Sequence, residues 1–529
     1  MVSRRWLDLF SLTGAVAVTR FAFRSHDLYD VDSVNFALGM ARFDPRVHQP
    51  HPPGYFLYVY LGRLLNFPLH NANLALVMLS IIASFGTAIV IYLLASDWFG
   101  LLAARFAGAL FLLSPLAWFH GIVALTYSVE AFFSALIGYL CWSVYRGRAN
   151  LVLAAAVVLG ISAGIRPSSL LFLGPLFLFS LSHAPRRRVA GILVLLVTLT
   201  AWFLPMVAAS GGFGDYFGAL FSLWGIVPAK TTVFNSSPAN SIARAFTIFF
   251  IYLLGFGAAS IAPFGARYRT GLDDPGKKKF TLVWIGPALC FFTFIFLQFV
   301  NSGYLLLLIA PACVWLGYWA AQWYQNTGWR KPAKLALIGV FATVNILIFL
   351  DSPFYCSYRS VRRFEATMEA VRAALPQVAS PQETLLIGFD SHFLGYRHAG
   401  YYLPDYFTVE YPEVRLREGV RVFAMHGRDT RLLAALPTSQ YSRFVLFPLP
   451  AGAASYKEYL QTVRHKLPPA GLQTIHLAGF DFVTGPIADL AYLFPRAMAL
   501  PPGVSAPSRS SAACKQPCTP TPATSSITP

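Results

Sequence analysis

The chain has 529 residues, of which 56% are hydrophobic and only 12% are charged, and its formal net charge is +18. A soluble domain carries about 25% charged residues, so charge this sparse excludes a soluble globular protein of this length. The basic residues recur in short clusters between apolar runs, which is typical of the cytoplasmic loops of membrane proteins and excludes a nucleic-acid partner. We therefore predict a polytopic α-helical membrane protein.

A membrane-spanning helix needs about 20 apolar residues. The two short runs 151–165 and 168–183 are counted as two helices rather than one kinked span, because only then do the later basic clusters share a side with the basic N-terminus. This topology places the N-terminus in the cytoplasm and everything after about residue 351 outside. In chain order we predict about eleven spans, near residues 6–23, 73–96, 102–119, 121–145, 151–165, 168–183, 189–209, 243–265, 280–299, 303–324 and 333–350.

The composition changes after the last predicted span, and the chain becomes a small α/β domain over residues 352–500. A run from Arg397 to Pro404 is aromatic and basic, and either contacts glycan or packs inside this domain. The tail 501–529, rich in Pro, Ser, Thr and Ala, is predicted to be disordered. The predicted elements are an amphipathic helix at Tyr358–Leu375, strands at Thr384–Phe389, Arg421–Met425, Arg443–Leu449 and within Leu472–Thr484, and a helix at Ser455–Leu467.

The first outer loop, residues 24–72, gathers carboxylates in a part of the chain where acidic residues are scarce. Carboxylates at the edge of an apolar protein are costly to desolvate, so they tend to be functional or paired. Asp30 and Asp32 lie one residue apart and offer either ligands for a divalent cation such as Mg or Mn, or a general base. The alternative is a solvated loop in which Asp32 caps a helix running from Ser33 to Arg42.

The same loop continues as His-Gln-Pro-His-Pro-Pro-Gly-Tyr from His48 to Tyr55. Three prolines and a glycine restrict this backbone, which predicts a rigid turn. His48 and His51 then offer either metal ligands or hydrogen-bond donors to a phosphate or a sugar.

An Asp pair just after the first span, followed by His51-Pro-Pro-Gly-Tyr55 at the start of an amphipathic helix, resembles the GT-C superfamily of membrane glycosyltransferases. The resemblance covers roughly residues 1–350 and is strongest to the protein O-mannosyltransferase and lipid-A-sugar transferase branch. It implies an enzyme that takes a sugar from a polyprenyl-phosphate carrier on the outer side of the membrane. The acceptor would be a glycan, a lipid or a protein, and the location a bacterial inner (plasma) membrane.

The resemblance also implies roles for individual residues. Asp32 would be the base that activates the acceptor hydroxyl, and Asp30 would support it or bind metal. Many relatives have an acidic residue directly after this Asp, whereas this chain has Ser33. The metal dependence of those relatives therefore does not carry over to this chain on the resemblance alone. The segment from Gly303 to Leu306 is similar to a later feature of the family, without the arginine found there.

Further candidates lie at the outer ends of other predicted spans. Glu130 either lines the acceptor side together with Tyr127 or is the structural partner of an arginine. Arg166 either holds the leaving phosphate with His51, because guanidinium suits phosphate oxygens, or extends to the membrane interface. Tyr55 completes the predicted substrate-binding residues, beside His48.

Two other functions use the same membrane setting. A lipid or glycan transporter or flippase usually carries ionisable groups at the bilayer midplane, in two repeated halves, whereas this chain shows no internal repeat and gathers its acids in an outer loop. A glycan ligase or polymerase usually has a large outer loop late in the chain, whereas the late outer loop near Asn301 is short. Glycosyl transfer is therefore the favoured function.

Overall fold

The computed structural model describes the chain except for residues 1, 227–231, 236, 257–273, 298, 327, 353–355, 417–418, 449–459 and 499–529. The described residues form two compact units, 1–362 and 363–529. The division falls within the long helix α17 (Tyr358–Val378) rather than at the end of the last predicted span. The predicted disordered tail lies outside the described residues, as does the end of the span predicted at 243–265.

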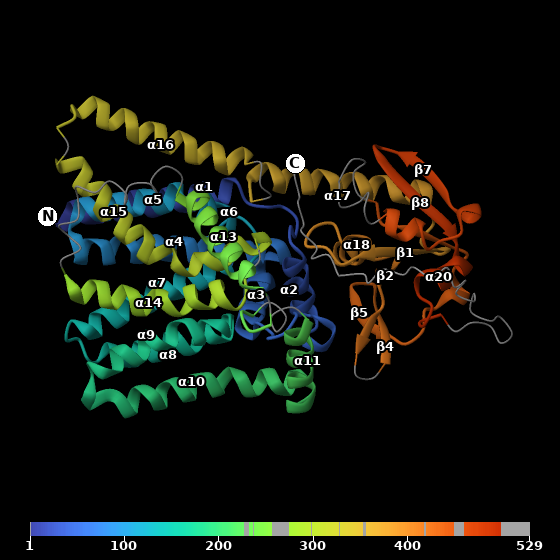
Figure 1. Cartoon of the computed structure of the whole chain (residues 1–529), viewed down its shortest axis with the longest axis horizontal. Coiled ribbons are helices and arrows are strands. Elements are labelled where there is room, and N and C mark those ends of the chain that lie inside the picture. The colour runs from blue at the N-terminus through green and yellow to red at the C-terminus, as the bar shows by residue number, and fades with distance from the viewer. Residues whose placement is uncertain are drawn as a thin grey trace. The chain divides into compact units, whose positions relative to one another are not determined.

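The first unit is a bundle of apolar helices, as the composition predicts (Figure 1). Six of its described helical segments are long and apolar enough to cross a membrane, and α5, α8 and α9 are shorter apolar helices. The exact number of spans stays a prediction. The principal helices are α1 (Val2–Ala22), α4 (Ala72–Phe99), α5 (Leu101–Leu113), α6 (Pro115–His120), α7 (Tyr127–Tyr145), α8 (Leu151–Ile165), α9 (Ser168–Ser182), α10 (Arg188–Ala209), α11 (Phe213–Ile226), α13 (Pro238–Phe256), α14 (Pro275–Phe294), α15 (Ile309–Asn326) and α16 (Lys331–Asp351).

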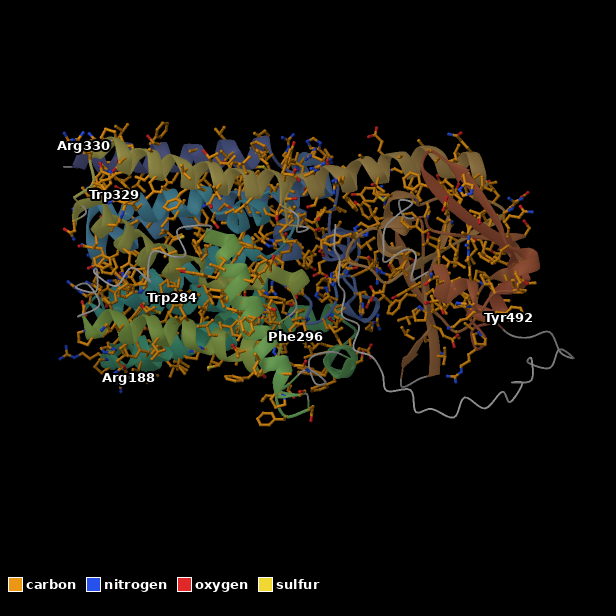
Figure 2. The ribbon with its side chains drawn as sticks, turned by 45° about the horizontal axis from the view of Figure 1, so that its top comes forward. Arg188, Trp284, Phe296, Trp329, Arg330 and Tyr492 are labelled. Carbon is orange, nitrogen blue, oxygen red and sulfur yellow. The ribbon has the colours of Figure 1, made fainter. Side chains whose placement is uncertain are left out.

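Close helix packing in this unit depends on small residues, which let neighbouring helices approach in a membrane. A Cβ added to Gly138 of α7 would lie 2.3 Å from the ring of Trp284 on α14. Trp284 is fully buried, and its indole nitrogen donates to the Ser134 hydroxyl at 3.1 Å (Figure 2). The labelled Arg188 and Arg330 lie at the same end of the bundle, as expected for basic clusters that share one side of a membrane (Figure 2).

The first loop folds into α2 (Val31–Ala41), the short 3-10 turn η1 (Pro45–Val47) and α3 (Phe56–Leu69). The alternative in which Asp32 caps this helix is not the one found: Asp30 is the N-cap, and its carboxylate accepts the backbone N–H of Asp32 at 2.9 Å. A cap residue has an extended backbone while the next residues are helical, and Asp30 has φ −108° and ψ 154°. The carboxylate of Asp32 therefore does not cap α2 and can contact other groups.

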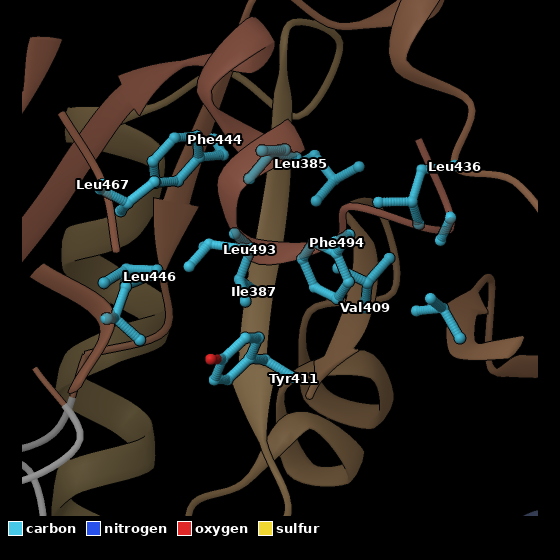
Figure 3. Packing of buried hydrophobic residues seen from close by; sticks show 14 of the residues in the cluster. Leu385, Ile387, Val409, Tyr411, Leu436, Phe444, Leu446, Leu467, Leu493 and Phe494 are labelled. Atoms are coloured by element: carbon cyan, nitrogen blue, oxygen red, sulfur yellow. The ribbon is translucent and has the colours of Figure 1, made fainter. Parts of the chain in front are cut away.

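The second unit is built on an eight-stranded sheet in which seven strands follow the order β3-β4-β2-β1-β6-β8-β7 and the eighth, β5, pairs with β4. The central strand β1 runs parallel to β2 and β6, and the outer pairs are antiparallel. Its core is apolar and lies against β1, around Ile387 and Phe494 (Figure 3). The strands are β1 (Thr384–Phe389), β2 (Phe407–Tyr411), β3 (Val414–Leu416), β4 (Gly419–His426), β5 (Asp429–Leu433), β6 (Arg443–Leu446), β7 (Gln473–Leu477) and β8 (Phe480–Pro486).

The α/β character of this unit was predicted, but β2, β3 and β5 were not. The run predicted as Leu472–Thr484 is a hairpin of two strands. Of the helix predicted at Ser455–Leu467, residues 460–464 are helical, and residues 455–459 lie outside the described residues. The aromatic and basic run near Arg397 forms the short helix α18 (Tyr396–Tyr402). Arg397 and His398 are buried there, so this run packs inside the unit.

Candidate active site

Asp32 stands in the first turn of α2, with its side chain 28% exposed, and faces the turn that precedes α3. Its Oδ1 lies 3.2 Å from Nδ1 of His51, and Nε2 of the same imidazole lies 3.2 Å from the hydroxyl of Tyr55. The predicted base and two predicted substrate-binding residues therefore form one connected group. A carboxylate, an imidazole and a phenol in this arrangement can accept and donate protons at neighbouring atoms.

The proline-rich turn holds this group in place. Gly54 has φ +107°, a conformation that suits glycine because it has no Cβ, and Tyr55 follows as the N-cap of α3 with φ +46°. The Tyr55 ring packs edge-on against Phe36 of α2 at 5.2 Å between centroids. Burial raises the pKa of Tyr55, so its phenol stays protonated and can donate a hydrogen bond.

Arg166 takes its position from the proline that follows it. A residue before proline disfavours helical backbone, and Arg166 ends α8 with φ −149° and ψ 104°. Its side chain is 5% exposed, and its Nε lies 3.2 Å from the Glu130 carboxylate of α7. Glu130 is therefore the partner of an arginine, which was one of its two predicted roles, and Nη1 of Arg166 donates to the Thr126 hydroxyl at 3.0 Å.

Two tyrosine rings lie against this guanidinium. The Arg166 carbon Cζ lies 4.6 Å from the ring centroid of Tyr127 and 4.5 Å from that of Tyr304. Tyr304 belongs to the 3-10 segment η5 (Phe299–Leu308) and was not among the predicted site residues. The similarity of the Gly303–Leu306 segment to a feature of the family was the signal that pointed to it.

The loop cluster and the arginine cluster are neighbours. The hydroxyls of Tyr55, Tyr127 and Tyr304 all lie within electrostatic range of Asp32. The structure thus brings together residues from the first loop, α7, the α8–α9 junction and η5. His48 ends η1 with a left-handed backbone, and its predicted substrate role stays a prediction.

Arg46, another residue that was not predicted, connects the first loop to α11. Its guanidinium pairs with Asp44 and with Asp215 of α11, at 2.9 Å in each case. Gly211 and Gly212 form the turn before α11 with φ of +93° and +105°. This ion-pair network borders the turn that carries His51.

The chemistry of these side chains bears on the predicted metal. Among the described residues, no group of three or more His, Cys, Asp or Glu side chains is arranged to hold a metal ion. One oxygen of Asp30 already accepts the backbone N–H of Asp32. A Mg or Mn ion at Asp30 and Asp32 would need further ligands from a substrate phosphate, as such ions often have.

Residues 45–189 match the family model described as the protein O-mannosyl-transferase TMEM260 N-terminal domain. A comparison with curated proteins gives no significant match. Among solved structures, ArnT from Cupriavidus metallidurans in the apo state is similar with a TM-score of 0.54 and 12% identity, over 92% of this chain and 98% of that one. Its undecaprenyl-phosphate-bound form gives 0.53 and 12%, over 91% and 98%.

The archaeal oligosaccharyltransferase AglB from Archaeoglobus fulgidus gives a TM-score of 0.44 at 11% identity, over 90% of this chain and 74% of that one. The predicted likeness to the GT-C superfamily is confirmed by the family model and by the fold shared with ArnT. The matched range contains the turn from His48 to Tyr55 as well as Glu130 and Arg166. The family model over residues 45–189 supports glycosyltransferase activity for this chain.

Proposed function

We propose that this chain transfers a sugar from a polyprenyl-phosphate carrier to an acceptor on the non-cytoplasmic face of the membrane. The observation that carries the proposal is the group of Asp32, His51 and Tyr55 at the starts of α2 and α3, beside the buried Arg166. The family model of an O-mannosyltransferase supports the reaction class, and the ArnT structure bound to undecaprenyl phosphate supports the kind of carrier. The acceptor is a glycan, a lipid or a protein.

Asp32 is the base in this proposal. It removes the proton from the acceptor hydroxyl, and the acceptor oxygen attacks the anomeric carbon of the donor sugar. The bond between that carbon and the phosphate oxygen breaks, and the electron pair leaves with the polyprenyl phosphate. Attack opposite the leaving phosphate inverts the anomeric centre. Asp30 supports this step by capping α2, which orients Asp32.

The leaving phosphate develops negative charge that a nearby donor stabilises. His51 lies next to both Asp32 and Tyr55, so it is the first candidate for that contact. Tyr127 lies on the acceptor side in this proposal, with Glu130 held beneath it as the partner of Arg166, and His48 is a further substrate-binding candidate. A Mg or Mn ion, if one binds at Asp30 and Asp32, would neutralise the same phosphate charge.

The test is the substitution Asp32→Asn in the full-length protein, reconstituted in lipid and assayed with undecaprenyl phosphates that carry labelled sugars. Loss of a general base typically costs 10²- to 10⁴-fold in rate, so we expect at least about 100-fold slower transfer. The control is Asp351→Asn, which changes an exposed acid at the end of α16 and should leave transfer unchanged. Full activity of the Asp32→Asn protein would refute the assignment of the base.

A further inference from the structure

The surroundings of Arg166 differ from those of an arginine that is open to a phosphate. Two tyrosine rings lie against its guanidinium, Nε faces Glu130, and Nη1 donates to Thr126. We propose that Arg166 and Glu130 form a positioning unit that holds the tyrosines Tyr127 and Tyr304 beside Asp32. Arg166 acts through these rings rather than as a ligand of the leaving phosphate. This inference rests on the proposed function, because it assigns a role within the same site.

The unit joins three parts of the chain that are distant in sequence. Glu130 and Tyr127 belong to the first turn of α7, Arg166 ends α8, and Tyr304 belongs to η5. Glu130 also accepts a hydrogen bond from the Ser169 hydroxyl of α9 at 3.3 Å. An ion pair this deeply buried holds one geometry, since either partner left alone would be an uncompensated charge.

The two rings connect the buried pair to the reacting group. Tyr127 and Tyr304 contact each other edge-on, with 5.5 Å between centroids, and both hydroxyls lie within electrostatic range of Asp32. Gly303, just before Tyr304, permits this contact, because a Cβ there would lie 2.3 Å from the Tyr127 ring. The position of these rings relative to Asp32 therefore depends on where Arg166 holds them.

Lysine cannot replace arginine in this role. The guanidinium is a planar fork that can lie against aromatic rings while it donates in its plane, whereas the lysine ammonium is a compact point charge. A phosphate, in contrast, accepts a lysine readily as a point-charge partner. The two possible roles of Arg166 thus predict opposite behaviour of the Arg166→Lys protein.

The experiment compares Arg166→Lys, Arg166→Met and the double variant Arg166→Met/Glu130→Leu in the full-length protein in lipid nanodiscs. Turnover is measured with a panel of undecaprenyl phosphates carrying labelled sugars, and affinity with undecaprenyl phosphate alone. The control is Arg188→Lys at the start of α10, an arginine that donates to the backbone carbonyls of Leu181 and Ser182. Thermal unfolding of every variant records its stability.

We expect both single variants to lose kcat by a similar factor of about 10 to 100, since a misplacement of about 1 Å is enough for such a loss. Affinity for undecaprenyl phosphate should stay within about threefold of the wild-type value. The double variant should regain stability, because an apolar replacement of a buried pair is tolerated, but not kcat. This pattern would support the positioning role.

Three results would overturn the inference. Near-normal turnover of Arg166→Lys, or a tenfold or greater loss of undecaprenyl phosphate affinity in Arg166→Met, would make Arg166 a charge ligand of the carrier. Recovery of kcat in the double variant would show that the Arg166–Glu130 pair contributes only to stability and does not position the tyrosines. A wild-type protein that neither binds undecaprenyl phosphate nor turns over any sugar of the panel would instead refute the proposed function itself.

Discussion

The substitution Gly303→Ala tests the position of the Tyr127 ring without removing any functional group. The added Cβ would lie 2.3 Å from Cδ2 of Tyr127, whereas ordinary contacts of such atoms begin at 3.4 Å. The ring, which is buried and stacked on Arg166, must therefore retreat by about 1 Å, and overpacking of this kind typically costs about 1–3 kcal/mol. Part of that cost is offset, because replacing glycine lowers the conformational entropy of the unfolded chain and so stabilises the folded state by about 0.4–1 kcal/mol.

We expect Gly303→Ala to lower the rate of sugar transfer by about 10- to 100-fold, because a group displaced by about 1 Å no longer meets the reacting atoms. The assay is turnover of labelled undecaprenyl-phosphate sugars in nanodiscs, with thermal unfolding measured in parallel. Gly286→Ala is the matched control, since a Cβ at that position on α14 meets nothing within 4 Å. If Gly303→Ala keeps a rate within twofold of the wild-type rate, the position of Tyr127 does not govern the reaction.

Two further predictions address the N-cap and the second unit. Asp30→Asn should keep the cap of α2 and most of the activity, whereas Asp30→Ala should lower the free energy of unfolding by about 1 kcal/mol and slow sugar transfer. Equal losses of activity in both variants would mean that the charge of Asp30 takes part in the reaction. In the second unit, burial and, after it, the charge of Asp390 raise the pKa of Glu410 from 4.5 to about 8. The folded protein therefore favours the protonated carboxyl, and the resulting contribution to the free energy of unfolding is fully present below pH 4.5 and is lost as the pH rises towards 8. Because one pKa unit corresponds to about 1.4 kcal/mol, that loss amounts to several kcal/mol. Glu410→Gln should remove this pH-dependent loss of stability. In the full-length protein, hydrogen exchange of β2, corrected for intrinsic rates, should then no longer accelerate between pH 5 and 8, and unchanged acceleration would contradict the prediction.

The helices were predictable because a membrane requires long apolar runs, and such runs are visible in the sequence without any knowledge of contacts. The strands β2 and β5 were not, since each is short and mixed in composition and is defined by its pairing with a neighbour. The local pattern also could not decide which aspartate caps α2. Asp30 and Asp32 are both good cap residues one residue apart, and the choice depends on how the whole loop folds.

The site shows the same division between local and distant information. His51 and Tyr55 lie four residues apart around restricted backbone, so their proximity follows from the sequence, and the structure places their side chains 3.2 Å apart. The contact between Arg166 and Tyr304 joins residues far apart in the chain, and no local pattern predicts it.

Glu130 connects these two kinds of information. The sequence left it either as the partner of an arginine or as part of the acceptor pocket, and the structure pairs it with Arg166 while both lie within electrostatic range of Tyr55. The two roles are therefore compatible, because the pair holds Tyr127 and Tyr304, whose hydroxyls lie within electrostatic range of Asp32. A carboxylate that never touches substrate can in this way still determine the shape of the pocket. Glu130→Gln, which keeps the volume but removes the charge, should consequently lower kcat while the KM for the carrier sugar stays close to the wild-type value, and a rise in KM alone would contradict this argument.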